Sequence, residues 1–448
     1  MRAVASNISA RPRSPTDLEG AAARAAAPSP ISHLDAAGAN AVKTLIKAAR
    51  LIDGTGAAPV ENPVLVVAGG RIESVVRGEL PSDLAGAEVH DYPGATILPG
   101  LIDTHVHLNL PGDGTILEDA VRETEGVLVA TSALATTKAL RAGITTLRDL
   151  GAKGRTAIDV RRALQLGHGD GARVVACGQA ITITGGHVWY LGGEADGVDG
   201  VRKKVREMVK LGADFIKVMA SGGGTVGTQS WNPSFSQEEL NALADEAHRF
   251  DRKATAHCLC ARSIEMAIEA GFDQLEHAGF IADRSGQQIY EPAVAEKLAK
   301  SGIPVTGTLA VGGAVLRELR ARPSLTETEA AFLARWEKSA AQNLDQFSKL
   351  REAGVTFVAG TDAGWRFTRF DDLPLEMELM REGGMTAMDT IVAATGYAAK
   401  VIDIDSQTGS LKPGLAADVL VVGADPLVDL AALRDVRLVM QGGKVLGV

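Results

Sequence analysis

The sequence predicts an α/β fold in which a TIM (β/α)8 barrel carries a small β-sandwich domain built from both ends of the chain. The middle of the chain alternates eight apolar strand candidates with helical segments, and eight such alternations predict a closed parallel barrel. Short strand-like runs occur at both ends instead. The 448 residues exceed the roughly 250 that such a barrel needs, which leaves room for a smaller domain.

We expect four segments along the chain. Residues 1–40, rich in Ala, Arg, Ser and Pro, are expected to form a flexible extension. Residues 41–98 and 404–448 are expected to form the two parts of the β-sandwich, and residues 99–403 the barrel. The first segment has no apolar region of the kind found in secretory signals, and no apolar run could span a bilayer, so we expect a cytoplasmic protein with no membrane partner.

The strands at the two ends are predicted from apolar runs between turn residues. Gly69 and Gly70 separate two of them as a hairpin turn. The runs are Lys43–Ala48, Val64–Val67, Arg71–Val76, Asp418–Val422, Arg437–Met440 and Lys444–Leu446.

The barrel strands are predicted from short, continuous apolar runs, which are typical of strands buried on both faces. The candidates are Thr104–Leu108, Thr145–Leu150, Arg173–Cys177, Phe215–Ala220, Ala254–His257, Gln274–His277, Pro304–Leu309 and Thr356–Thr361.

Two of the helices between them begin with a capping box, a hydroxyl residue followed three positions later by Glu. Ser236 and Glu239 begin the first, and Thr326 and Glu329 begin the second, which should end near Gly354. The inward stripes are predicted to be Leu240, Leu243, Ala247 and Phe250 in the first helix, and Phe332, Trp336, Ala340, Leu344 and Phe347 in the second.

Composition excludes several partners and sites. The 46 Lys and Arg against 55 Asp and Glu give a net charge of −9, which argues against nucleic acid and is neutral toward a small-molecule substrate. Three cysteines make a disulfide framework improbable. Cys258 and Cys260 form a CxC pair, which we interpret as buried thiols and not as metal ligands.

The strongest local motif is His105-Val106-His107. Residues i and i+2 of a strand face the same side, so both imidazoles should point into the barrel mouth, where they could bind a metal ion. His257, His277 and Asp362 end three later strand candidates. The C-terminal ends of barrel strands converge on one site. For any one of these residues a hydrogen-bonded structural position is the alternative; five together favour a metal site.

Lys217 lies between apolar residues on a predicted buried strand. A buried ammonium is costly unless it is paired or neutralised. Carbamylation by carbon dioxide would turn it into a carboxylate able to bridge two cations. An ion pair with Asp214 or Glu276 explains the residue equally well, so the sequence leaves both alternatives open.

These residues and their flanking motifs resemble the amidohydrolase superfamily from about Val42 onward. Within it, the chain is similar to the imidazolonepropionase-like prolidases and metal-dependent carboxypeptidases or dipeptidases. The motifs are Pro99-Gly100-Leu101-Ile102-Asp103, Gly143-Ile144-Thr145-Thr146, Thr184-Gly185-Gly186-His187, Ala220-Ser221-Gly222-Gly223 and Leu411-Lys412-Pro413-Gly414. One departure is Phe235, because these enzymes often have a carboxylate-binding Tyr there.

The resemblance implies two divalent ions, with zinc expected and cobalt or manganese acceptable to the same ligands. It assigns His105, His107 and Asp362 to one ion, His257 and His277 to the other, and N6-carboxylysine at Lys217 to both. It also implies that Asp362 transfers protons, that His187 contacts the substrate carbonyl or carboxylate, and that the chain forms a homo-oligomer, possibly an octamer.

We therefore expect hydrolysis of amide bonds in dipeptides or N-acyl amino acids, including aromatic amides such as ochratoxin-type mycotoxins. Candidate substrate contacts are Trp189, Tyr190, Ser221, Gly222, Trp365 and Arg366. Cyclic-amide hydrolysis or deamination, and hydrolysis of a phosphotriester or lactone, are alternatives on the same fold. A non-catalytic scaffold is a further alternative, which the complete ligand set disfavours.

Overall fold

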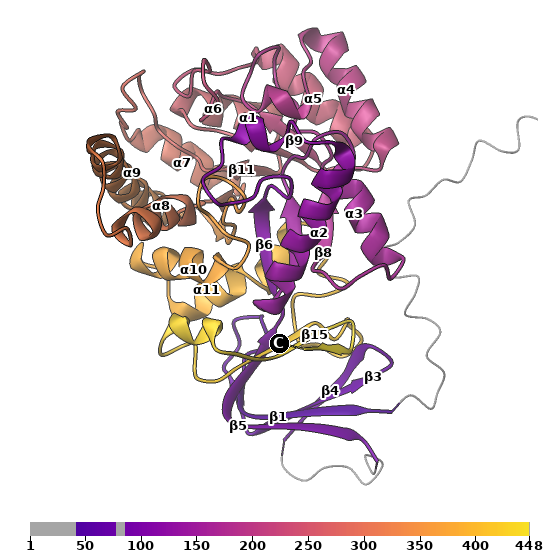
Figure 1. The fold of residues 1–448 in the computed structure, drawn as a ribbon. Helices are drawn as coiled ribbons and strands as arrows, with labels where there is room; N and C mark the ends of the chain where they lie inside the picture. The colour runs from indigo at the N-terminus through magenta and orange to yellow at the C-terminus, as the bar shows by residue number, and fades with distance from the viewer. Residues whose placement is uncertain (1–41, 78–85, 448) are drawn as a thin grey trace, which may run out of the picture. The chain divides into compact units, whose positions relative to one another are not determined.

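Strands from both ends of the chain join one mixed sheet of eight strands in the computed structural model, which describes residues 42–77 and 86–447. All described residues belong to one compact unit, residues 37–448. The sheet order is β16-β15-β14-β5-β1-β3-β4, with β2 paired to β1 (Figure 1). The strands are β1 Thr44–Leu51, β2 Val60–Glu61, β3 Pro63–Ala68, β4 Arg71–Arg77, β5 Glu88–Pro99, β14 Val419–Val422, β15 Val436–Gln441 and β16 Lys444–Leu446.

All six strand candidates at the chain ends are confirmed, including the β3–β4 hairpin. Strand β5 was not predicted from the sequence. Its first half is polar and partly exposed, and its second half, Ala95–Pro99, is buried. Strand β5 pairs in parallel with β1 and antiparallel with β14, so it connects the N-terminal strands to the C-terminal ones. The expected flexible extension, residues 1–40, lies outside the described residues.

The middle of the chain forms two parallel sheets, β6-β7-β8 and β13-β12-β11-β10-β9. All eight candidates contain a strand, although the last two are reduced to two residues each. The strands are β6 Leu101–Val106, β7 Ile144–Asp149, β8 Arg173–Ala176, β9 Ile216–Met219, β10 Ala254–His257, β11 Gln274–Glu276, β12 Val305–Thr306 and β13 Phe357–Val358.

Parallel bridges join the two sheets at both edges. Val106 pairs with Ala363 after β13, and Ile181, after β8, pairs with Val218 of β9. Two backbone hydrogen bonds accompany the bridges, from Asp362 N to His105 O at 2.7 Å and from Ile181 N to Lys217 O at 2.8 Å. The strand ends that carry the candidate ligands are therefore held together by backbone pairing.

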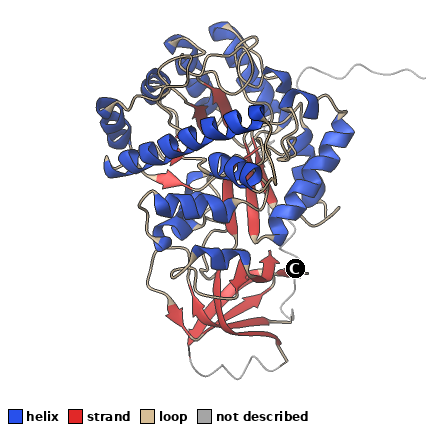
Figure 2. Ribbon diagram, turned by 60° about the vertical axis from the view of Figure 1, so that its left-hand side comes forward, coloured by secondary structure: helices blue, strands red, loops and turns tan. Residues whose placement is uncertain are grey.

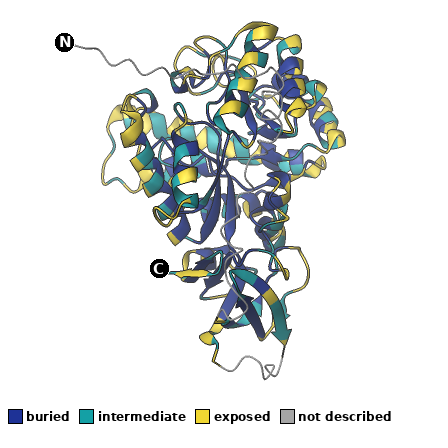
Figure 3. Ribbon diagram, turned by 90° about the vertical axis from the view of Figure 1, so that its right-hand side faces the viewer, coloured by how far each residue is buried: buried dark blue, intermediate teal, exposed yellow. Residues whose placement is uncertain are grey.

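Helices surround the parallel strands, which are buried on both sides (Figures 2 and 3). No described helix combines the length and the apolar character needed to span a bilayer. The helices are α1 Leu117–Ala120, α2 Glu125–Arg141, α3 Thr156–Gln165, α4 Gly197–Leu211, α5 Gln237–Arg249, α6 Ala261–Ala270, α7 Pro292–Ser301, α8 Ala310–Arg320, α9 Glu327–Glu352, α10 Leu373–Glu382, α11 Ala387–Ala393 and α12 Gly396–Val401.

Both predicted capping boxes are present, at the starts of α5 and α9. Two details of the predicted stripes are wrong. Phe250 is 39% exposed because it lies at the C-cap of α5, where the chain leaves the helix. In α9 only Phe347 of the predicted stripe is buried, because the first half of this helix lies against a cavity and not against the core.

Candidate metal centre

Two histidines and an aspartate meet where β6 ends. The Nε2 atoms of His105 and His107 lie 3.5 and 3.3 Å from Oδ1 of Asp362, and all three side chains are buried. Their possible ligand atoms lie within 4.8 Å of one another, so the group could hold a metal ion. Burial raises the pKa of Asp362, an effect that the charges of His105 and Lys217 oppose.

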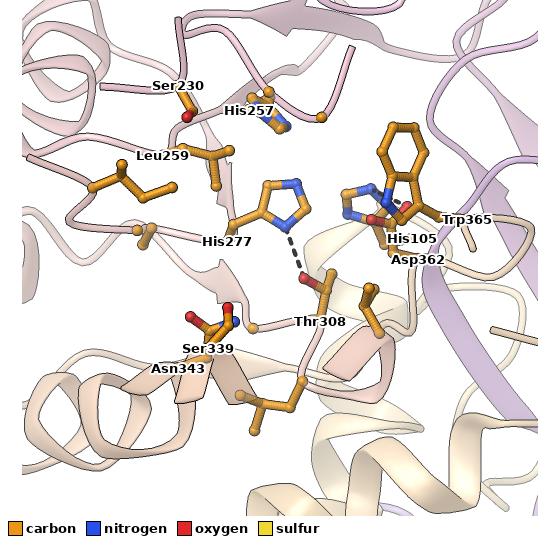
Figure 4. Close-up of a pocket in the computed structure, with 18 of the residues that line it drawn as sticks. His105, Ser230, His257, Leu259, His277, Thr308, Ser339, Asn343, Asp362 and Trp365 are labelled. Carbon is orange, nitrogen blue, oxygen red and sulfur yellow. Dashed lines mark hydrogen bonds and ion pairs between the residues drawn. The ribbon is translucent and has the colours of Figure 1, made fainter. Parts of the chain in front are cut away.

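Two further histidines lie beside this group. His257 ends β10, and His277 follows β11 with a left-handed backbone, φ 69°. The ring centroids of His257 and His277 are 4.6 Å apart, and that of His105 is 5.1 Å from His277. Figure 4 shows His277 turned toward Thr308, with Asp362 near His105. The five ligand-type side chains thus converge from four strands, as the sequence predicts.

One ring nitrogen of His107 and one of His257 lie at hydrogen-bond distance from a carbonyl oxygen, which leaves the other nitrogen of each ring free. Nδ1 of His107 lies 3.1 Å from Gly151 O, and Nε2 of His257 lies 3.2 Å from Gly222 O. A carbonyl oxygen only accepts hydrogen bonds, so each of these nitrogens carries the proton and the other keeps its lone pair. Burial is the largest cause that lowers the pKa of both rings well below the usual value, so both are neutral, the state a metal ligand requires.

Lys217 lies in β9 and is 1% exposed. Its Nζ has no hydrogen-bond partner within residues 42–77 and 86–447. The ion pair with Asp214 does not form, because Asp214 pairs with Arg161, and Nζ makes no bond to Glu276 either. Burial lowers the pKa of Lys217, against the opposing charges of Glu276 and Asp362.

The Glu276 carboxylate supports the candidate metal centre through its contact with His105. Its Oε2 lies 2.8 Å from Nδ1 of His105, and its Oε1 accepts a hydrogen bond from the Thr255 hydroxyl at 2.6 Å. Burial opposes ionisation, but the charges of His105, Lys217 and Arg148 outweigh it and hold the pKa of Glu276 well below its usual range. The carboxylate is therefore ionised and fixes the proton of His105 on Nδ1, which leaves Nε2 free.

His187 lies next to the five side chains, with its ring centroid 4.8 Å from that of His257. Its Nδ1 lies 2.8 Å from the Thr225 hydroxyl oxygen, which accepts the Val188 N–H at 3.0 Å. Burial, with the charge of Lys217, lowers the pKa of His187 to about 3, so the ring is neutral. A Cβ at Gly223 would lie 2.5 Å from Nε2 of His187, so only glycine leaves this ring in place.

All seven predicted metal and catalytic side chains line one cavity of about 330 Å³. They are His105, His107, His187, Lys217, His257, His277 and Asp362. The rest of the wall comes mainly from the loops after β9, β10, β11, β12 and β13 and from helix α9 (Figure 4). A ligand at the histidines would thus also contact these loops and α9.

The six predicted substrate contacts separate into three pairs. Trp365 and Arg366 line the cavity. Trp189 is 45% exposed, and neither it nor Tyr190 is among the lining residues. The other two support the backbone: the Ser221 hydroxyl accepts the Leu259 N–H at 3.0 Å, and Gly222 O receives the His257 proton.

Three parts of the site were not predicted from the sequence. They are the Glu276 carboxylate that contacts His105, the Thr225 hydroxyl that contacts His187, and the cavity wall formed by α9. Only Glu276 had a local signal, because it precedes a predicted ligand on a buried strand. The CxC cysteines, Cys258 and Cys260, are not among the residues that line the cavity, and Cys258 Sγ donates to Ser263 O at 3.5 Å.

Comparisons with known proteins agree with this geometry. The model of the amidohydrolase family matches residues 96–446. An ochratoxinase of Aspergillus niger is 30% identical and aligns with 90% of this chain and 86% of its own. The crystal structure of a Xaa-Pro dipeptidase with bound methionine is 28% identical with a TM-score of 0.78, covering 90% of this chain and 99% of that one. The A. niger ochratoxinase structure is 29% identical with a TM-score of 0.75, covering 90% and 95%.

Proposed function

This chain belongs to the amidohydrolase family, and from that premise we propose that it is a binuclear metal-dependent hydrolase of dipeptides or N-acyl amino acids. The family and the ochratoxinase relative support hydrolysis of amide bonds. The similarity to an ochratoxinase and to the structure of a Xaa-Pro dipeptidase favours substrates with an amide next to an amino-acid carboxylate. Aromatic amides of the ochratoxin type belong to this class.

The observation that carries the proposal is the unpartnered Nζ of Lys217 among free imidazole nitrogens. Nε2 of His105 and His107 face Oδ1 of Asp362, which accepts no hydrogen bond from the described residues, while their Nδ1 atoms lie against Glu276 and Gly151 O. Converging lone pairs and a buried, unpaired amine are costly in an apolar interior. Divalent cations, with Lys217 carboxylated, would satisfy both.

The residues fit two ions. His105, His107 and Asp362 would hold one, and His257 and His277 the other, with carboxylated Lys217 bridging them. Burial favours a neutral Lys217 amine, whose nitrogen can bond to the carbon of carbon dioxide and release a proton. The ligand set suits zinc. Bound ions would supply Lewis acidity for the substrate carbonyl and for water.

The chain's own groups would then position the substrate and move protons. Asp362 would accept a proton from the attacking water at the carboxylate oxygen that does not hold the ion, and deliver it to the leaving amine. Neutral His187 would donate one hydrogen bond from Nε2 to the substrate carbonyl or carboxylate, with Nδ1 accepting the hydroxyl proton of Thr225. Trp365, 9% exposed, would exclude water on the side of His187, since the two rings lie 5.6 Å apart.

We also infer the finer architecture. The bridges at both edges of the two parallel sheets support one closed eight-stranded barrel over residues 99–403. Residues 41–98 and 404–448 would form the β-sandwich. The proposed β-sandwich is supported by the hydrogen bond from Ile72 N to Leu415 O at 2.9 Å, which holds β4, at one edge of the sheet, against the segment before β14. The proposed homo-oligomer rests on the resemblance alone, and the proposed cytoplasmic location rests on the composition of residues 1–40.

The test is a substrate screen of protein reconstituted with zinc and bicarbonate. We expect release of amines from dipeptides and N-acyl amino acids, and loss of that activity on chelation and in Lys217→Ala. Turnover restricted to cyclic amides, phosphotriesters or lactones would contradict the proposed substrate class. Activity that survives chelation would contradict the proposed metal dependence.

A further inference from the structure

One side of helix α9 forms a wall of the cavity. The lining residues of this helix recur mostly at intervals of three or four positions, which places them on one face. They are Phe332, Arg335, Trp336, Ser339, Asn343, Gln346, Phe347 and Leu350. Figure 4 shows Ser339 and Asn343 on this helix, below His277 in the view. A ligand bound at the histidines can thus extend to the first half of α9.

Two arginines are the charged groups of this cavity outside the candidate centre. Arg335 comes from α9, and Arg366 from the loop that follows Asp362. Neither forms an ion pair or a hydrogen bond through its side chain within the described ranges. Most neighbouring arginines are paired: Arg320 binds Glu337, and Arg322 binds Glu329. Two unpaired guanidiniums therefore give the outer cavity a positive charge.

Arg366 is held in place by its backbone and not by an acidic partner. Its φ is 56°, and its carbonyl oxygen accepts the Gly114 N–H at 2.7 Å. Its Nε is buried with no partner in the described part of the chain. Burial, and then the charge of Arg335, lowers the pKa of Arg366, against the opposing charge of Glu118. A guanidinium with free donors is a ready binding group for a carboxylate.

Apolar groups surround this charge. Phe332 and Trp336 contact each other on α9 with ring centroids 6.0 Å apart. These two rings and the Arg335 guanidinium lie on the same face of α9, so an apolar group and a charge are offered side by side.

We propose that Arg335 and Arg366 together bind the carboxylate of an N-acyl amino acid whose apolar side chain packs on Phe332 and Trp336. This assignment rests on the proposed function and deepens it, because it makes α9 the determinant of substrate class. The carboxylate would lie at the α9 end of the cavity, with the scissile amide toward the histidines. The guanidiniums make no covalent step; they bind and orient.

The test compares two ligands that differ only by a carboxylate, N-benzoyl-L-phenylalanine and N-benzoylphenethylamine. Calorimetry measures binding to the zinc-loaded protein, and amine release measures turnover. We expect Arg335→Gln and Arg366→Gln each to weaken binding of the acid about 10- to 100-fold, the value of a charged hydrogen bond. Binding of the neutral ligand should change less than about threefold, and Arg335→Lys should recover part of the loss.

Lys338→Gln is the matched control, since it removes the same charge from an exposed position of α9 outside the cavity lining. It should leave both ligands unaffected. An equal loss for both ligands in the arginine variants, or an acid preference that persists in both, would overturn the assignment. If the acid binds through the arginines but neither ligand is hydrolysed, the carboxylate site stands and the proposed amide hydrolysis fails for this substrate class.

Discussion

Nδ1 of His105 lies 2.8 Å from Oε2 of Glu276, and both side chains are buried. The ionised carboxylate holds the imidazole proton on the side away from the cavity. It also fixes the ring plane, so Nε2 faces Asp362. Glu276, which precedes the candidate ligand His277, thereby orients the candidate ligand His105 from a different strand.

Glu276→Gln should weaken metal binding about 10- to 100-fold, because the amide provides no negative charge to hold the proton on Nδ1 of His105. Retained metal after dialysis against a graded chelator measures the change. The fold should persist, since Arg148 keeps its 2.7 Å hydrogen bond to Gln274. Unchanged metal affinity would show that His105 is oriented by other contacts.

Thr225→Val should lower kcat/KM about tenfold, because the Nδ1 of His187 loses the hydroxyl that orients it. His187→Phe should lower kcat/KM about 100-fold by also removing the bond to the substrate. Metal content should stay at the wild-type value in both variants, since neither residue is a proposed ligand. A loss of metal in either variant would instead make His187 part of the metal centre.

Gly223→Ala should reduce activity with little change in metal content, because the new Cβ would lie 2.5 Å from the His187 ring and displace it. Gly200→Ala is the control, as its Cβ would meet nothing within 4 Å in helix α4. That change should leave kcat unaffected and slightly raise stability. Equal activity of the two variants would contradict the role of this close approach.

The sequence predicted the parallel strands because continuous apolar runs between turn residues are a local property. Strand β5 escaped prediction because its polar first half is stabilised by pairing with β1, and only its buried second half also pairs with β14 from the other end of the chain. The ligand-type residues were recognisable from their positions at strand ends. The α9 wall was not, because Phe332 and Trp336 have the same helical spacing whether they face a core or a cavity.

Glu376 provides a pH test away from the ligands. It is buried, accepts the Ala310 N–H at 2.6 Å, and has its pKa raised to about 8, chiefly by burial. A raised pKa means that the folded state holds a proton that the unfolded state loses above about pH 4.5. Glu376 therefore lowers the free energy of unfolding as the pH rises from about 4.5 to about 8, by about 1.4 kcal/mol per pH unit at most.

Glu376→Gln should remove this cost. Denaturant titrations should show the variant gaining stability over wild type between pH 5 and pH 8, with a much smaller difference at pH 5. Both proteins must be compared in the same metal state. A difference that does not change with pH would mean that Glu376 is ionised in the folded protein.

The metal content of Lys217→Ala tests the account most directly. After reconstitution with zinc and bicarbonate and removal of free metal, wild type should retain about two ions per chain by elemental analysis. Lys217→Ala should retain about one or fewer, whereas the exposed control Lys338→Ala should match wild type. Equal metal content in wild type and Lys217→Ala, or a wild type that retains no zinc, would contradict the account.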